Sequence, residues 1–269
     1  MLVRSRVIAV SFCCLSLTFQ HGSMKIQTKI VNGVERPITE MPYMVSLRIN
    51  GRHICGGGIL NEKWGITAAH CIERYQEEKI EQEDPPTLSV QSGSTKLYQG
   101  GTQHDVSRFV IYNKYDSSTT DYDIALFKIR GSFKFSNTTR SLILPGFIPY
   151  DDSWGTAGGW GTSSPDDDSF AENLESITLP KVNKEDCYNS YGRYACAVKS
   201  KVTPRNVCYG FWEGGADTCR GDSGGPLVTF NDVLLGITSW GLGCARPKFP
   251  GLYTDVSQFV EWIVKNIQT

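Results

Sequence analysis

Alternating apolar and polar residues predict that most of the chain forms short β-strands. Residues 44–49 alternate in this way, and Asn50-Gly51 then offers the two positive-φ positions of a tight hairpin turn. Comparable runs, punctuated by Gly, Pro, Asn and Asp, predict further strands at residues 52–55, 88–91, 106–112, 124–129, 176–179, 227–230 and 234–239. The pattern is typical of an all-β protein.

Helical periodicity is convincing only at the C-terminal end. Between residues 256 and 267 the apolar residues recur at the spacing of one helical face, so we expect a terminal helix that docks on the β body; they are Val256, Phe259, Val260, Ile263 and Ile267. Two polar stretches interrupt the strand pattern, at residues 73–84 and 163–169. We interpret both as solvated surface loops rather than dedicated cation sites.

The first residues follow the pattern of a secretory signal peptide. Arg4 and Arg6 precede an apolar run over residues 7–19, and small and polar residues follow. The run is shorter than the roughly 20 residues that a membrane-spanning helix needs, and it lacks the polar face of an amphipathic helix. We expect a signal peptide over residues 1–22, cleaved between Thr18 and Ser23, and a secreted, extracellular protein that does not associate with a membrane.

Charge and composition exclude some classes of function. The 269 residues are 40% hydrophobic and 20% charged, as in a globular protein of one large or two modest domains. With 27 Lys and Arg against 28 Asp and Glu, the net charge of −1 gives no broad positive field for nucleic acid or an anionic membrane. The function must therefore come from a local site.

Cysteine use agrees with export. Cys13 and Cys14 leave with the signal peptide, and seven cysteines remain: Cys55, Cys71, Cys187, Cys196, Cys208, Cys219 and Cys244. Export favours disulfides, whereas a zinc site is disfavoured because the mature chain has no close C-x-x-C pair. We expect no metal and no cofactor. The odd number leaves one thiol over.

Three segments carry residues suited to nucleophilic catalysis. Ser223 lies in the glycine-rich sequence GDSGGP, His70 lies in TAAHC, and Asp123 precedes an apolar strand. The serine also fits the G-x-S-x-G pattern of α/β-hydrolases, but those enzymes need a histidine after the serine and none follows here. Subtilisin-like enzymes place the aspartate first, and no aspartate precedes His70.

The order His70, Asp123, Ser223 resembles that of chymotrypsin-family proteases. The resemblance runs from Ile30 to the C-terminus and includes the motifs IVNG at 30–33, CGG at 55–57, GWG at 159–161, SWG at 239–241 and PGLY at 250–253. It implies two six-stranded antiparallel β-barrels packed together, with a C-terminal helix. The protease domain would span residues 30–269, divided near residues 145–155.

The resemblance also implies roles for single residues. Ser223 would attack the scissile carbonyl, His70 would act as base and then acid, and Asp123 would orient His70. The backbone N–H groups of Gly221 and Ser223 would form the oxyanion hole. Asp217 would lie at the bottom of the primary pocket and select Lys or Arg, with further pocket residues at Ser239, Trp240, Gly241 and Gly251. That Asp217 is only a loop aspartate is disfavoured by its fixed offset from Ser223.

Activation and disulfides follow from the same resemblance. Cleavage after Lys29 would remove a propeptide of residues 23–29 and free the amino group of Ile30, which would pair with Asp222 and shape the oxyanion hole. Activity would then fall at alkaline pH as this ammonium loses its proton. The implied disulfides are Cys55–Cys71, Cys187–Cys208 and Cys219–Cys244, which leaves Cys196 without a family partner.

Several residues depart from the family pattern or have a structural interpretation. Arg220, at the pocket mouth, should favour acidic and disfavour basic residues near the scissile bond. Gly65 replaces a larger apolar residue and is expected to loosen packing behind His70. His53 and His104 are interpreted as structural or surface histidines. Asn137 begins the clearest glycosylation sequon.

The expected function is therefore hydrolysis of peptide bonds after Lys or Arg, by a monomer made as a zymogen. Protein or peptide substrates and protein protease inhibitors are the expected partners. The alternative is a catalytically inactive, protease-like paralogue that binds a partner through its surface loops. The triad and oxyanion positions favour the enzyme, while Arg220, Gly65 and the odd cysteine keep the alternative open.

Overall fold

The computed structural model describes residues 30–81, 86–146, 152–164, 166–192 and 201–268. The predicted signal peptide, its cleavage site, Lys29 and Cys196 lie outside the described residues. None of the described helices is long and apolar enough to cross a membrane.

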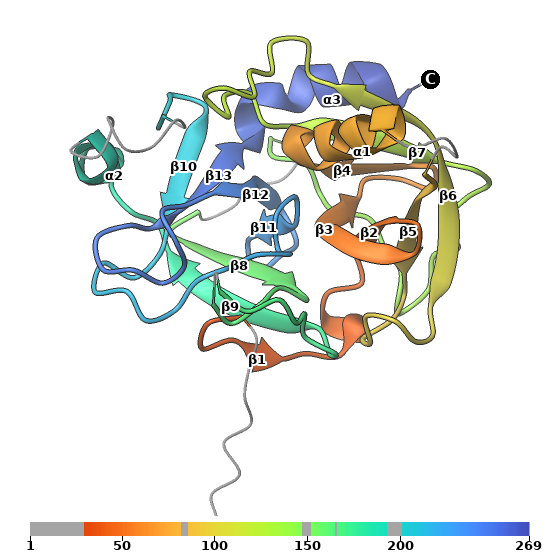
Figure 1. Ribbon diagram of the computed structural model, residues 1–269, viewed down its shortest axis with the longest axis horizontal. Coiled ribbons are helices and arrows are strands. Elements are labelled where there is room, and N and C mark those ends of the chain that lie inside the picture. Colours follow the sequence, from red (N-terminus) through yellow and green to blue (C-terminus); the bar gives the residue numbers. More distant parts are fainter. Residues whose placement is uncertain (1–29, 82–85, 147–151, 165, 193–200, 269) are drawn as a thin grey trace, which may run out of the picture.

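The first half of the chain forms a closed six-stranded barrel (Figure 1). Its strands follow one another in the order β2-β3-β4-β7-β6-β5. They are β2 (Met44–Ile49), β3 (Arg52–Ile59), β4 (Trp64–Thr67), β5 (Leu88–Ser92), β6 (Thr102–Ile111) and β7 (Ala125–Ile129). Asn50 and Gly51 turn β2 into β3 with φ values of 49° and 77°, so the predicted hairpin is confirmed.

The second half, together with β1 from the N-terminal end, forms a curled sheet in the order β1-β9-β8-β11-β12-β13-β10. The strands are β1 (Val34–Glu35), β8 (Trp154–Gly159), β9 (Glu175–Pro180), β10 (Asn206–Tyr209), β11 (Pro226–Val228), β12 (Leu234–Trp240) and β13 (Gly251–Asp255). The chymotrypsin-like all-β fold is confirmed, with one difference in detail. The six expected strands run from β9 to β10, and only an isolated bridge between Lys181, just after β9, and Tyr209 of β10 closes them into a barrel. β1 adds a seventh strand at the edge, next to β9.

The helices differ more from the sequence prediction. The predicted C-terminal helix is present as a 3₁₀ turn (Val256–Phe259) followed by α3 (Val260–Ile267), and a further short 3₁₀ turn spans Ile38–Glu40. Residues 73–84 were expected to form a loop, but α1 (Ala69–Glu81) covers most of them, and α2 (Lys184–Gly192) was not expected. Residues 163–169 have no helix or strand where they are described, as expected.

Packing across the two halves fixes where they meet. The C-terminal segment belongs to the second half in sequence, yet Val256, Phe259 and Ile263 are buried in the core cluster that includes the first barrel. At the seam the Gly56 N–H donates to the Ser223 carbonyl over 2.8 Å, and a Cβ on Gly56 would lie 2.9 Å from the Gly225 Cα. Only glycine permits this approach of two backbones.

Candidate active site

Two elements of the first barrel bring His70 and Asp123 together. His70 lies in the first turn of α1, and Asp123 lies just before β7. The Nδ1 of His70 lies 2.8 Å from Oδ2 of Asp123, and the backbone N–H of His70 donates to Oδ1 over 2.9 Å. Ser239 Oγ also donates to Oδ2, over 2.6 Å, and Thr254 Oγ1 donates to the Asp123 carbonyl over 2.8 Å. The second half therefore holds Asp123 in place.

These contacts set the proton positions and the pKa values of the pair. Burial lowers the pKa of His70, but the charge and hydrogen bond of Asp123 outweigh burial and raise it above its ordinary value of 6.5. Burial raises the pKa of Asp123, and the contact with His70 outweighs this and lowers it below 3.8. Asp123 is therefore ionised, so Nδ1 of His70 carries a proton, and Nε2 is the acceptor in the neutral ring.

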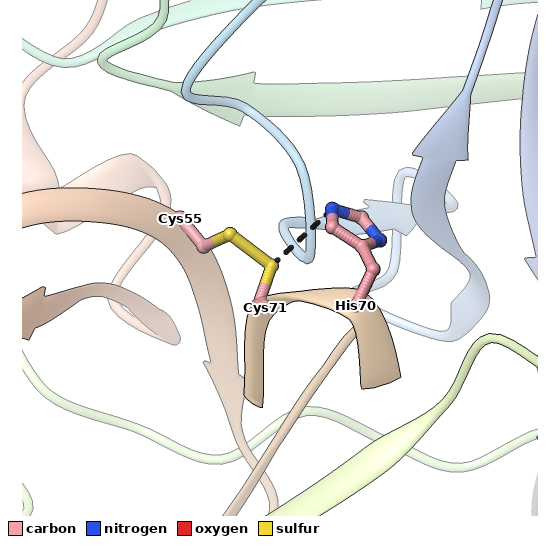
Figure 2. Close-up of side chains that lie close together, drawn as sticks. All are labelled: Cys55, His70 and Cys71. Atoms are coloured by element: carbon pink, nitrogen blue, oxygen red, sulfur yellow. Dashed lines mark hydrogen bonds between the residues drawn. A yellow bond between two sulfur atoms is a disulfide. The ribbon is translucent and has the colours of Figure 1, made fainter. Parts of the chain in front are cut away.

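Ser223 lies on the loop before β11, and its side chain shares a cavity with His70. The cavity has a volume of about 1030 Å³ and is lined by both residues. No hydrogen bond joins Ser223 Oγ to His70 Nε2 among the described contacts, and Nε2 lies 3.5 Å from Sγ of Cys71 instead (Figure 2). Such a contact is often long without substrate and tightens when one binds.

Gly221 and Ser223 present two backbone N–H groups beside this cavity. Within the described part of the chain, neither N–H has an intramolecular hydrogen-bond partner. Gly221 has a φ of 93°, and a Cβ there would lie 2.7 Å from the Phe170 ring, so the position requires glycine. Unpaired donors beside a nucleophile are what an oxyanion hole requires, so both groups are candidates for one.

A buried polar chain holds the Gly221 peptide. His53 Nε2 lies 2.9 Å from the Gly221 carbonyl, and His53 Nδ1 lies 2.9 Å from Ser46 Oγ, which accepts from Arg48 Nε over 3.1 Å. Because a carbonyl only accepts, Nε2 carries the proton and Nδ1 accepts from Ser46. Burial is the main cause that lowers the pKa of His53 to about 4. The hydrogen bond to the Gly221 carbonyl acts to raise this pKa, and the charge of Arg48 acts to lower it. His53 is thus a neutral, structural histidine.

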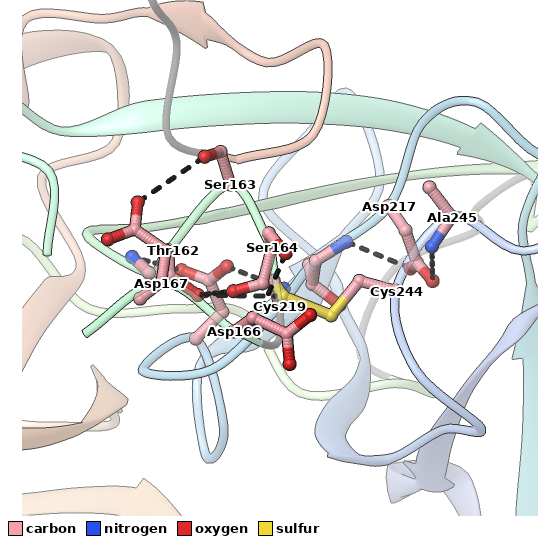
Figure 3. Close-up of a disulfide and its surroundings, with 12 residues drawn as sticks. Thr162, Ser163, Ser164, Asp166, Asp167, Asp217, Cys219, Cys244 and Ala245 are labelled. Carbon is pink, nitrogen blue, oxygen red and sulfur yellow. Dashed lines mark hydrogen bonds between the residues drawn. A yellow bond between two sulfur atoms is a disulfide. The ribbon is translucent and has the colours of Figure 1, made fainter. Parts of the chain in front are cut away.

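Asp217 lies in a second cavity, of about 310 Å³, that also reaches Ser223. Ser239, Trp240, Gly241 and Gly251 line the same cavity, so the structure brings together all the residues proposed for the primary pocket. Asp217 accepts from the N–H groups of Ala245 (3.1 Å) and Thr218 (2.8 Å), as Figure 3 shows for Ala245. Burial nevertheless raises its pKa to about 7, against these hydrogen bonds. Among the described residues, no cationic side chain forms an ion pair with this carboxylate.

Asp222, the residue before Ser223, resembles Asp217: it is buried and its carboxylate accepts hydrogen bonds from backbone N–H groups. Its carboxylate accepts from Gly161 N–H (2.8 Å) and Cys219 N–H (2.9 Å), and burial raises its pKa to about 7, with a further contribution from the charge of Glu175. The nitrogen of Ile30, still a peptide nitrogen here, donates to Oε2 of Glu175 over 2.6 Å. Ile30 is fully buried. Two buried carboxylates therefore lie in the region that Ile30 enters.

Comparison with known proteins agrees with this geometry. The family profile described as Trypsin matches residues 30–263. The chain is 37% identical over 248 residues to Trypsin 5G1 of Aedes aegypti, covering 90% of this chain and 86% of that protein. It is 35% identical to Hypodermin-A of Hypoderma lineatum (90% and 88% covered) and 32% identical to Trypsin delta of Drosophila melanogaster (94% and 95% covered).

The chain belongs to the trypsin family. It is a trypsin-like serine endopeptidase that acts on proteins or peptides.

This trypsin-family chain has three disulfides among its described residues, in the pairs that the resemblance implies. They are Cys55–Cys71, Cys187–Cys208 and Cys219–Cys244. The ligand atoms of Cys55, His70 and Cys71 lie close together, but the two sulfurs are bonded to each other (Figure 2). A disulfide sulfur is not a thiolate, so the cluster is not a metal site. Its role is to anchor the first turn of α1 to β3.

The structure shows the contacts of the residues that depart from the family pattern, and the positions of His104 and Asn137. A Cβ on Gly65 would lie 2.2 Å from the Phe127 ring, so this buried ring fills the space and the expected loosening behind His70 is wrong. Arg220 forms an ion pair with Asp168 (3.0 Å) that the sequence did not reveal. His104 is buried against Ser92 Oγ and the Phe133 ring, a structural position. Asn137 is exposed in a turn.

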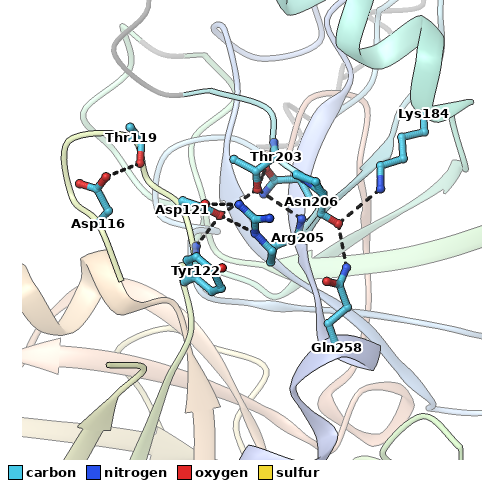
Figure 4. A network of polar contacts seen from close by, with 10 residues as sticks. Asp116, Thr119, Asp121, Tyr122, Lys184, Thr203, Arg205, Asn206 and Gln258 are labelled. Atoms are coloured by element: carbon cyan, nitrogen blue, oxygen red, sulfur yellow. Dashed lines mark hydrogen bonds and ion pairs between the residues drawn. The ribbon is translucent and has the colours of Figure 1, made fainter. Parts of the chain in front are cut away.

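A second polar network lies beside Asp123 and was not anticipated (Figure 4). Asp121 accepts from Arg205 Nε (3.1 Å) and Thr203 Oγ1 (2.8 Å), both from the segment that leads into β10. The Arg205 guanidinium lies over the Tyr122 ring at 4.6 Å. Since Asp121 precedes Asp123 by two residues, the network holds the Asp123 loop against the second half. Sequence patterns give no signal for such a contact, because its members are far apart in the chain.

Proposed function

We propose that this chain is a secreted serine endopeptidase that hydrolyses peptide bonds after Lys or Arg through an acyl-enzyme. The observation that carries the proposal is the junction of two cavities at Ser223. One cavity contains His70, which contacts Asp123, and the other contains the buried and uncompensated Asp217.

The chemistry follows from the proton positions. Neutral His70 accepts the Ser223 proton at Nε2 as Oγ attacks the carbonyl carbon, and the oxyanion forms opposite the N–H groups of Gly221 and Ser223. The imidazolium next to Asp123 then gives its proton to the leaving amine, which leaves an ester on Ser223. Water, deprotonated by His70, hydrolyses the ester. Asp123 stays ionised throughout and stabilises the charged ring.

Specificity comes from Asp217. Burial disfavours the charge of this carboxylate and raises its pKa to about 7. An ammonium or guanidinium group that enters the cavity supplies the missing partner, whereas an apolar side chain leaves a buried carboxylate unpaired. A Cβ at Gly251 would lie 3.0 Å from Asp217 Oδ1, so a side chain there would crowd the carboxylate.

Activation is proposed to begin with removal of residues 1–22 on export and of residues 23–29 by cleavage after Lys29. The freed ammonium of Ile30 then pairs with Asp222. Glu175 is a further partner that the sequence did not suggest, because it already accepts from the same nitrogen in the uncleaved chain. One ammonium between two buried carboxylates binds strongly and keeps the Ser223 loop ordered. The enzyme is proposed to act as a monomer, open to protein inhibitors that occupy both cavities.

The test starts from the purified full-length precursor. Cleavage after Lys29, confirmed by Ile30 as the new N-terminus, should yield activity on arginyl and lysyl amides and little on a phenylalanyl amide. Ser223→Ala should lower kcat by a factor of about 10³ or more. If a correctly processed and folded chain hydrolysed none of the three substrates, the proposal would be refuted.

A further inference from the structure

The two cavities at Ser223 receive opposite sides of the substrate. Only Arg220 and Ser223 line both of them. His70 lines the larger cavity but not the smaller one. Since His70 gives its proton to the leaving amine, the larger cavity holds the residues that follow the scissile bond, while the smaller one holds the Lys or Arg side chain before it.

The charges on the larger cavity are mostly positive. Arg52, Arg74 and Arg220 line it, and Asp168 is the one carboxylate in the lining that the structure describes. All four side chains are exposed. Arg52, on the first residue of β3, has no ion pair or side-chain hydrogen bond among the described residues. Within the described lining there are thus three guanidinium groups and one carboxylate. Arg74 and Arg220 each take part in a further interaction as well.

Asp168, the carboxylate described in this lining, is held only weakly by Arg220. Asp168 pairs with Arg220 at 3.0 Å, but the two side chains are 90% and 59% exposed. Exposed pairs of this kind are weak, so a substrate carboxylate can replace Asp168 at little cost. The neighbouring Asp166 and Asp167 do not line the cavity. Nearby Glu73 accepts from Tyr115 and does not line it either.

We propose that the enzyme prefers substrates with Asp or Glu among the first three residues after the scissile bond, bound by Arg52, Arg74 and Arg220. This inference rests on the proposed function and extends it to the other side of the cut. Three extended residues reach about 10 Å beyond Ser223, and guanidinium groups bind carboxylates with two parallel hydrogen bonds. The expected preference is about tenfold for three exposed charges, and it weakens in salt.

The chain's own activation site lacks this feature. The residues after Lys29 are Ile-Val-Asn-Gly-Val, and the first acidic residue is Glu35. The enzyme should therefore cleave its own precursor less readily than a peptide with an acidic residue after the cut. Activation by a different protease is then favoured over activation by a second copy.

Matched peptides test the proposal. Each has the same sequence with Arg before the cut, and either Glu or Gln at the first, second or third position after it. We expect the kcat/KM ratio of the Glu to the Gln peptide to reach about ten at one position or more. The triple variant Arg52→Gln, Arg74→Gln, Arg220→Gln should bring this ratio close to one. Arg130→Gln, which removes an exposed charge outside the cavity, should keep it.

The outcomes separate this inference from the proposed function. An arginyl anilide has no residues after the scissile bond, so its hydrolysis reports the proposed function alone. Anilide hydrolysis with Glu-to-Gln ratios of one or less at all three positions would overturn the acidic preference only. If the chain proved inactive, binding of the same peptides to the Ser223→Ala variant would still decide: tighter binding of the Glu peptides supports the inference, and equal binding overturns it.

Discussion

The two cavities that meet at Ser223 use charge in opposite ways. The smaller one holds a buried carboxylate, Asp217, whose pKa burial raises to about 7. The larger one carries exposed guanidinium groups that water and salt screen. A buried charge without a partner discriminates strongly because a wrong ligand leaves it uncompensated, whereas an exposed charge only biases the choice. Strong selection is thus expected before the scissile bond and weak selection after it.

The largest predicted effect comes from removing the charge of Asp217 in the smaller cavity. Asp217→Asn removes the charge but keeps the shape, so kcat/KM for arginyl substrates should fall about 10²- to 10³-fold, in line with the loss of one partner of a buried charge pair. Hydrolysis of matched arginyl and phenylalanyl amides measures this. Asp186→Asn, at an exposed position on α2, is the control and should leave the rates unchanged. Equal rates for Asp217→Asn and the parent enzyme would show that Asp217 does not select the substrate.

The second prediction concerns the stability of the precursor. The folded-state pKa of Asp217 is raised from 3.8 to about 7, so between these values the folded chain binds more protons than the unfolded chain. The contribution of Asp217 to the free energy of unfolding is therefore fully present below about pH 4 and is lost as the pH rises through about 7. The loss amounts to about 4 kcal/mol at most. Asp217→Asn should remove this loss and make the precursor more stable than the parent at pH 8. Denaturant unfolding at pH 4, 6 and 8 measures the difference; no gain at pH 8 would contradict it.

The third prediction concerns the buried carboxylates near Ile30. In the cleaved enzyme, Glu175→Gln removes one of the two negative charges near the ammonium, so the ammonium pKa should fall. The alkaline loss of activity should then move to lower pH by about one unit. The pH profile of kcat/KM measures it. Glu172→Gln, which removes an exposed partner of Lys96, is the control and should leave the profile in place. An unmoved profile in Glu175→Gln would show that Glu175 does not hold the ammonium.

The smallest predicted effect sharpens the contrast between the cavities. Raising the salt concentration from 0.05 to 0.5 M should lower the preference for Glu over Gln after the cut about twofold or more, because the arginines are exposed. The preference for Arg over Phe before the cut should change less, because Asp217 is buried. The same peptides in both buffers measure it. Equal salt dependence on both sides would mean that the two cavities do not differ in screening.

Strand alternation predicted much of the fold. Residues 44–49 became β2 with the same bounds, and the Asn50-Gly51 turn followed from its positive-φ requirement. β8 escaped notice because most of its residues are small, and α1 escaped because its exposed face is rich in Glu and Gln. Secondary structure could be predicted from the local sequence only where the alternation of apolar and polar side chains was clear.

The candidate site was predictable to a different degree. His70, Asp123 and Ser223 were proposed from motifs, and the structure places them at one seam. The contacts of Glu175, Arg48 and Arg205 were not predictable, because each depends on packing between segments far apart in the chain. The effect of Gly65 was mispredicted for the same reason, since the ring that fills its space comes from another strand.

The most direct test of the opposite-charge account is the sequence profile around cleavage sites. A complex mixture of peptides would be digested with the cleaved enzyme at low salt, and residues on both sides of each cut would be counted. The account predicts Lys or Arg at nearly every position before the cut and enrichment of Asp and Glu in the three positions after it. Cuts without Lys or Arg before them, or depletion of acidic residues after them, would contradict it.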